Sequence, residues 1–205
     1  MRYASLDIET TGLSRLTCGI LQIAVVVDDL QDIRSVAKPV ESLPTFKRFI
    51  ALGSLNFEPY ALGMHMKSGL LNDYLADTTK KSFIQTLIDL DAFLKEHYPL
   101  GPKEKYNFAG KNLQGFDLPF IQQKHVETMV MNPIEFLNKI SHKVIDPAVF
   151  FTDLFYDKSP ASLDQCKERA GLEGGVTHDA LDDCRDVINL VRHIALHNKD
   201  VFKPE

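Results

Sequence analysis

The first predicted β-strand, residues 2–9, carries two acidic side chains on one face. Alternate residues of a strand point to opposite faces, so Asp7 and Glu9 share the face opposite to Leu6 and Ile8. Two neighbouring carboxylates repel each other, and holding them at the end of a buried strand costs stability unless a cation neutralises them. The pattern therefore indicates a divalent-cation site, with solvated carboxylates at a sheet edge as the alternative.

A sharp turn is predicted directly after this strand. Thr10, Thr11 and Gly12 are residues typical of turns, and Gly12 can adopt backbone conformations that other residues avoid. The apolar Leu13 then follows, and we expect it near the opening of the predicted site.

A further acidic residue, Asp117, lies in the first turn of a helix predicted at residues 115–125. A short apolar run from Phe108 leads to a polar turn at Asn112, and apolar residues at helical spacing follow. Helix capping and the helix macrodipole also favour an acid in this position. Taken alone, Asp117 fits either an N-terminal helix acid or a metal ligand.

The third segment contains His178 and Asp183, five residues apart, at the start of a long amphipathic helix predicted at residues 178–197. On a regular helix this spacing leaves the two side chains roughly 140° out of phase, so both reach one site only if His178 precedes the helix proper. Two preceding glycines are compatible with that. Asp183 is favoured over Asp182 because it neighbours the apolar face, although a histidine in this place is also typical of a cap or a surface residue.

Together the three segments resemble the motifs of the DnaQ-like 3′-5′ exonucleases of the DEDDh branch. These motifs read Asp-x-Glu, an Asp after Asn-x-x-x-Phe, and His-x-x-x-x-Asp, and the resemblance spans residues 2 to about 197. The positions that match are Asp7, Glu9, Asp117, His178 and Asp183.

The resemblance implies a two-metal phosphodiesterase. Asp7 would bridge two Mg²⁺ or Mn²⁺ ions, Glu9 and Asp183 would hold the ion that carries the attacking water, and Asp117 would support the other. His178 would act as general base on that water. We therefore expect removal of nucleoside 5′-monophosphates from the 3′ end of single-stranded or short nucleic acid.

Residues 60–71 resemble the segment with which relatives hold the terminal nucleotide. The pattern from His65 to Leu70 is similar to that of oligoribonucleases, and Met64-His65 is similar to the Val-His of polymerase proofreading subunits. Phe116 stands where oligoribonucleases generally carry Gln, which argues against a restriction to very short RNA. The expected substrate contacts are Thr10, Thr11, Leu13, Met64, His65 and Asn112, with a purely structural helix start around Met64 as the alternative.

Composition is compatible with these expectations. The 205 residues are 44% hydrophobic, which predicts one domain with a sizeable core, and the resemblance implies that residues 1–205 form a single DEDDh exonuclease domain. The sequence shows no membrane-spanning run or secretory signal, and its three cysteines have no CxxC spacing, so we expect a cytoplasmic protein. A net charge of -5 argues against tight binding to extended duplexes.

The predicted fold is α/β and, by resemblance, ribonuclease H-like, with a central mixed five-stranded sheet flanked by helices on both faces. Strands are expected at residues 2–9, 18–29, 31–38, 105–110 and 143–146. Helices are expected at 81–97, 115–125, 133–140, 147–155, 162–170 and 178–197.

Other functions stay open at this level. The fold could serve as a non-catalytic nucleic-acid-binding module, or as an endonuclease, and the residues do not separate DNA from RNA. A homodimer is expected by resemblance only, and no membrane association is expected.

Overall fold

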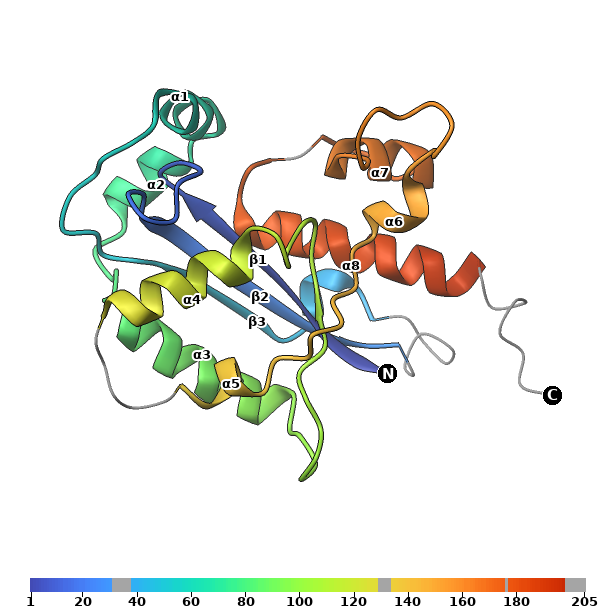
Figure 1. Ribbon diagram of the computed structural model, residues 1–205, viewed down its shortest axis with the longest axis horizontal. Coiled ribbons are helices and arrows are strands. Elements are labelled where there is room, and N and C mark those ends of the chain that lie inside the picture. Colours follow the sequence, from blue (N-terminus) through green and yellow to red (C-terminus); the bar gives the residue numbers. More distant parts are fainter. Residues whose placement is uncertain (31–37, 129–133, 176, 198–205) are drawn as a thin grey trace.

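The computed structural model describes residues 1–30, 38–128, 134–175 and 177–197. A four-stranded mixed sheet in the order β3-β2-β1-β4 forms its centre (Figure 1). The strands are β1 (Arg2–Thr10), β2 (Ile20–Asp29), β3 (Thr45–Phe49) and β4 (Phe108–Ala109).

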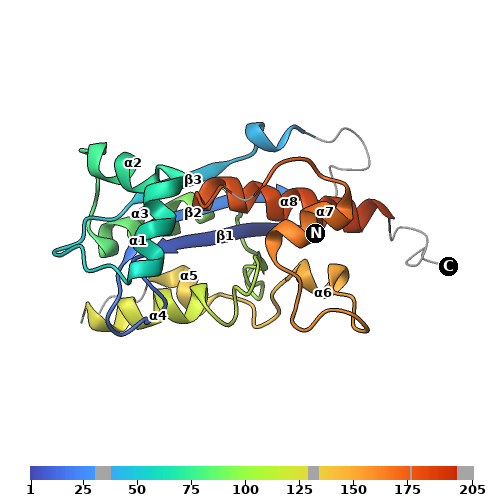
Figure 2. The same cartoon turned by 90° about the horizontal axis from the view of Figure 1, so that it is seen from above.

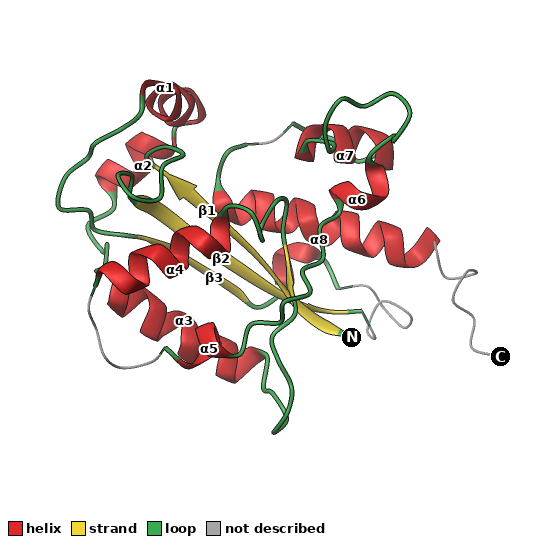
Figure 3. Cartoon of the chain, in the orientation of Figure 1, coloured by secondary structure: helices red, strands yellow, loops and turns green. Residues whose placement is uncertain are grey.

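Eight α-helices and one short 3₁₀ helix are found in the described ranges (Figure 3). They are α1 (Pro59–Ser68), α2 (Leu70–Ala76), α3 (Phe83–His97), α4 (Asp117–Glu127), α5 (Glu135–Asn138), α6 (Ala148–Phe151), α7 (Leu163–Ala170), α8 (Ala180–His197) and the 3₁₀ helix η2 (Val40–Ser42). None of these helices is long and apolar enough to cross a bilayer.

Strand register determines which residues share a face of the sheet. β1 pairs antiparallel with β2 and β2 antiparallel with β3, whereas β4 joins β1 in parallel. Asp7 lies opposite Ala24, which lies opposite Lys47 on β3. Glu9 lies opposite Gln22, and the register shifts by one residue directly after Glu9. Such an irregularity bends the strand end and changes the direction in which its side chains point.

Helices cover both faces of the sheet, and in Figure 2 β1 lies between α8 and α4. On one face Leu6 and Ile8 of β1 pack in a cluster with residues of α3, α4 and α5. On the other face Tyr3 packs with the apolar side of α8. α6 and α7 pack on the outer side of α8 around Leu190. Because Asp7 and Glu9 alternate with Leu6 and Ile8, they point to the α8 face.

The α/β class and the mixed sheet agree with the sequence prediction, but the strand count was wrong for the described residues. The segment predicted as a strand at 143–146 makes only a single parallel bridge, from Ile145 to Ala109. The strand predicted at 31–38 lies outside the described residues except for residue 38, which is not in a strand. β3 was missed because Lys47 and Arg48 interrupt its apolar alternation, as is common on an edge strand.

Candidate active site

The end of β1 presents the first two acids of the site. Glu9 is 6% exposed, and Asp7 is only partly exposed on the same face. Both point to the side of the sheet that α8 covers, as the alternation along the strand predicts. Two carboxylates are thus held beside a helix start rather than in open solvent.

Asp117 reaches this strand end from the N-terminus of α4. Its Oδ1 accepts a hydrogen bond of 3.1 Å from the Ile8 backbone N–H, and the residue is 3% exposed. Near the start of β1, the N–H of Ala4 points to the same edge of the strand as the Ile8 N–H. It donates to the backbone carbonyl of Asn107, the residue before β4. β4 ends at Ala109, so the Asp117 carboxylate supplies the acceptor that the strand no longer offers.

Asp183 enters from the first turn of α8. It is buried, and its Oδ1 has no hydrogen-bond partner in the part of the chain that the structure describes. Asp182, the competing candidate, has a side chain that is 47% exposed and pairs with Arg185 at 3.4 Å. The structure thus places Asp183, rather than Asp182, at the carboxylate cluster. A buried carboxylate oxygen without a donor fits a cation ligand.

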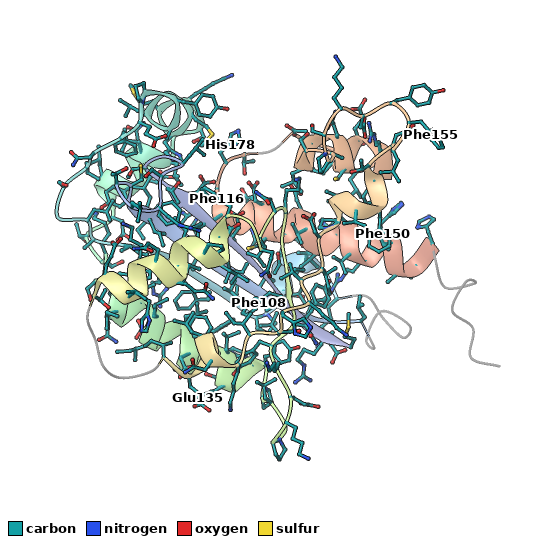
Figure 4. All side chains as sticks on the ribbon, viewed as in Figure 1. Phe108, Phe116, Glu135, Phe150, Phe155 and His178 are labelled. Carbon is teal, nitrogen blue, oxygen red and sulfur yellow. The ribbon has the colours of Figure 1, made fainter. Side chains whose placement is uncertain are left out.

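His178 precedes α8, which begins at Ala180, two residues after the predicted helix start, so the condition that helical phase sets for a shared site is met. Its φ of 55° is a left-handed conformation that non-glycine residues seldom adopt. One ligand atom each of Glu9, His178 and Asp183 lies within 4.8 Å of the other two. Figure 4 shows His178 between α1 and the start of α8.

Burial raises the pKa values of all four carboxyl groups, and neighbouring carboxylates add to the shift at Asp7, Glu9 and Asp183. Burial, reinforced by Asp183, Asp179 and Asp117, raises the pKa of Glu9 to about 8. Burial raises the pKa of Asp117 to about 7, although its backbone hydrogen bonds oppose the shift. Burial and then the charge of Asp186 raise the pKa of Asp183 to about 7. Burial and the charges of Asp117, Glu9 and Asp183 hold the pKa of Asp7 well above its usual range.

This donor set fits divalent cations. Oxygen ligands favour Mg²⁺ or Mn²⁺, and positive charge at this place would remove the repulsion that raises the pKa values. The residues that could hold such ions are Asp7, Glu9, Asp117 and Asp183, with His178 beside them.

The residues predicted to contact a nucleotide are distributed unevenly. Thr10 donates to the Gly12 carbonyl at 2.7 Å, and Thr11 accepts from the Gly19 N–H at 2.9 Å, so both hydroxyls hold the turn after β1. Leu13 is 74% exposed beyond that turn. Asn112 is exposed on the loop before α4, with a φ of 54°.

His65 lies in a buried environment beside Thr10 and Glu9. It is fully buried, its Nε2 lies 2.8 Å from the Thr10 carbonyl oxygen, and its Nδ1 lies 3.8 Å from Glu9 Oε2. A carbonyl partner requires the proton on Nε2, and burial lowers the pKa of this imidazole, so a neutral ring is favoured. In this arrangement His65 supports Thr10 and Glu9, and its contact with a nucleotide stays a prediction.

A cavity of about 630 Å³ lies between α1 and the loop that contains Thr177 and His178. Met64, one of the predicted contacts, lines it together with His178. Lys67 also lines it, and the sequence analysis missed Tyr60, which is 78% exposed, although an aromatic residue at a helix start was the available signal. The lining residues are Pro59, Tyr60, Gly63, Met64, Lys67, Ser68, Thr177 and His178.

The raised pKa values predict how stability depends on pH and metal. Unfolded carboxyls titrate at about pH 4, so the folded, metal-free protein binds more protons up to the pKa of about 8 at Glu9. Its free energy of unfolding should therefore fall as pH rises from about 4 to about 8. Mg²⁺ binds the deprotonated carboxylates, so it should raise the melting temperature more at pH 8 than at pH 5.

Thermal unfolding with EDTA or with Mg²⁺ across this pH range measures both effects. Asp183→Asn is the matched variant, and it should weaken the pH dependence and the Mg²⁺ effect together. An equal stabilisation by Mg²⁺ at pH 5 and pH 8 would contradict the assignment of these carboxylates to a cation site.

The protein is similar to known proteins in structure but not detectably in sequence. The sequence matches no protein-family model and no curated protein. The fold is similar to the crystal structure of the nuclease domain of 3′hExo, a DEDDh family member, bound to rAMP, with a TM-score of 0.68 and 16% sequence identity. The match covers 100% of this chain and 96% of that chain. The chain therefore has the α/β fold of a DEDDh nuclease domain, as its motifs indicated.

Proposed function

We propose that residues 1–205 form a single DEDDh exonuclease domain that hydrolyses phosphodiester bonds from the 3′ end of nucleic acid. The observation that carries the proposal is the meeting, at one end of β1, of acidic side chains from three distant segments with a histidine beside them. These five side chains are the ones that match the family's motifs: Asp7, Glu9, Asp117, His178 and Asp183.

The proposed cofactors are two Mg²⁺ or Mn²⁺ ions. Asp7, Glu9, Asp117 and Asp183 would hold them, and the orphaned Oδ1 of Asp183 supports this assignment. When bound, such ions neutralise charge on the phosphate and make water more acidic. Bringing four mutually repelling carboxylates together has no evident structural benefit without cations.

His178 is the proposed general base. It would take the proton from the attacking water as oxygen bonds to phosphorus and the P–O3′ bond breaks. The terminal nucleotide leaves as a 5′-monophosphate, and the O3′ atom of the shortened chain takes a proton from solvent to become a 3′-hydroxyl. A side chain held just ahead of α8, within reach of Glu9 and Asp183, suits that role.

The proposed substrate is the 3′ end of single-stranded or short DNA or RNA. The similar nuclease domain of 3′hExo binds rAMP, and the cavity between α1 and His178 could accept a nucleotide of that size. Leu13 and Tyr60 would offer apolar and aromatic surface to bases, and Lys67 a positive charge. An oligoribonuclease restricted to very short RNA is the narrower alternative.

A cytoplasmic location is also proposed. Cys18, Cys166 and Cys184 are free and buried, as is usual for a protein from a reducing compartment.

Product analysis tests the proposed activity. Purified protein with Mg²⁺ or Mn²⁺ should shorten 5′-labelled single-stranded DNA or RNA, from dinucleotides to about 20-mers, in a ladder from the 3′ end that a chelator abolishes. Cuts within a circular single strand would indicate an endonuclease instead. Binding without any cleavage would indicate a nucleic-acid-binding module.

The two adjacent acids of α8 provide a matched pair for the same assay. Asp183→Asn should lower kcat by about 10³-fold or more, because it removes a proposed metal ligand. Asp182→Asn should leave kcat unchanged, because this exposed carboxylate pairs with Arg185. Equal activities of the two variants would contradict the two-metal assignment.

Tyr60 should contribute mainly to substrate binding. Stacking of a base on an aromatic side chain is worth about 1–3 kcal/mol, so Tyr60→Ala should raise KM by about tenfold with little change in kcat. Tyr60→Phe keeps the ring and should behave as the wild type. Steady-state kinetics on a short oligonucleotide measures both, and a wild-type KM for Tyr60→Ala would exclude stacking on this residue.

A homodimer is proposed through the exposed apolar segment of α6 and the loop that follows it. Figure 4 shows Phe150 and Phe155 at the end of the molecule away from His178. The exposed side chains are Val149 (74%), Phe150 (58%), Leu154 (88%), Phe155 (93%) and Tyr156 (86%).

The apolar area that this segment exposes is large enough to be covered by a second copy of the chain. Three of the five side chains are aromatic and offer about 150–250 Å² each, so with Val149 and Leu154 the segment offers on the order of 800 Å², one partner's share of a standard interface. An apolar patch can cover itself across a two-fold axis.

Light scattering after size exclusion should give a dimer, and Phe155→Ser should shift it to monomer. Val126→Ser, at a 71% exposed residue of α4, is the control and should stay dimeric. A monomeric wild-type protein would overturn the proposal.

A further inference from the structure

Asp179, the residue directly after His178, is held by contacts that its place at a helix start does not require. Its Oδ1 accepts the Leu181 N–H at 3.0 Å, which is an ordinary capping bond. Its Oδ2 accepts two further donors, Lys47 Nζ at 2.6 Å and Gln22 Nε2 at 3.3 Å. A simple cap explains the first contact and leaves the other two to be explained.

The additional donors come from two strands of the sheet. Gln22 lies on β2 opposite Glu9, and Lys47 lies on β3 in the row that contains Asp7. Gln22 is fully buried, and its Oε1 also accepts the Ala180 N–H at 2.8 Å. The start of α8 is therefore bound to strand residues that are in register with the two β1 carboxylates.

His178 needs such support. Its φ of 55° is unfavourable for a residue with a side chain, and such a conformation persists only where the surroundings enforce it. Asp179 is the next residue, so fixing its carboxylate limits where the imidazole of His178 can lie. Two glycines, Gly174 and Gly175, lie shortly before and allow the backbone many conformations.

The identity of Asp179 is otherwise unfavourable. Its charge adds to the cluster and raises the pKa values of Glu9 and Asp183. Ser or Asn would cap α8 equally well without that charge. The ion pair with Lys47 is partly exposed, with side chains 35% and 19% accessible, so its contribution to stability is small. What the carboxylate adds over a neutral cap is a fixed attachment to β3.

We infer that Asp179, held by Lys47 and Gln22, is a positioning residue that keeps His178 at the carboxylate cluster. Its effect on catalysis rests on the proposed nuclease function. The effect on the histidine itself does not, because it can be observed without substrate or metal.

Kinetic variants test the catalytic effect. Asp179→Asn keeps a capping oxygen, and Lys47→Met removes the cation. Each should lower kcat by about 10–100-fold, the range for misplaced catalytic groups, while KM, Mn²⁺ affinity by calorimetry and melting temperature stay near wild type. The double variant should lose no more than either single one, because both remove the same contact. Lys47→Arg should restore most of kcat.

Lys81 and Asp89 provide a control pair. Their ion pair of 2.7 Å has side chains 44% and 23% accessible, comparable to the Lys47–Asp179 pair, but it joins α3 to the preceding loop. Lys81→Met and Asp89→Asn should leave kcat unchanged. If these variants lowered kcat as much as Asp179→Asn does, general loosening of the fold would explain the effect and the inference would fail.

The histidine signal tests positioning directly. In ¹³C-histidine-labelled, metal-free protein, the His178 ring resonance is assigned with His178→Ala. Asp179→Asn and Lys47→Met should shift or broaden this resonance, whereas the control pair should not. If the wild-type protein proves inactive, the proposed function fails and this signal still decides the inference.

Two further results would overturn the inference. One is an unchanged His178 resonance in Asp179→Asn, accompanied by wild-type kcat if the protein is a nuclease. The other is a large loss of Mn²⁺ affinity in Asp179→Asn, which would make Asp179 a metal ligand and not a positioning residue.

Discussion

Four carboxylates repel one another at the end of β1, and other contacts of the structure must offset this destabilising interaction. One strand can supply only two of them, Asp7 and Glu9, because a third would lie too far along its face. Asp117 and Asp183 arrive on helix starts from opposite layers. Each helix start must be held against its neighbours' charge, so the polar contacts there oppose a repulsion that the apolar packing farther along does not remove.

Those contacts use polar groups that the sheet leaves available. The N–H of Ile8 on β1 lies past the point where β4 ends, and it donates to the carboxylate of Asp117. Gln22 accepts the first N–H of α8, and the thiol of Cys184 donates to the Ala24 carbonyl at 3.4 Å. The short β4 is thus part of the site, because a longer strand would occupy the edge where Asp117 binds.

Short-range periodicity predicted the parts of the site that depend on one element alone. Alternation along β1 placed Asp7 and Glu9 on one face, and helical phase required His178 to lie ahead of α8 if it was to reach the same site as Asp183. It could not predict contacts between distant segments, such as that of Asp179 with Lys47, which is 132 residues away. The burial of His65 was missed for the same reason, since its partner Thr10 is 55 residues away.

Contacts between distant segments also engage two of the basic residues, which are then not free to bind phosphate. Lys47 binds Asp179 at 2.6 Å, and Lys167 binds Asp186 at 2.6 Å and the Gly175 carbonyl at 3.3 Å. Both lysines hold the segment around His178 in place. In a chain of net charge -5, positive charge for a phosphate would then come chiefly from cations at the carboxylate cluster. Such charge acts at the bond to be cut and not along an extended strand, which is the distribution suited to gripping only the last few nucleotides of a chain.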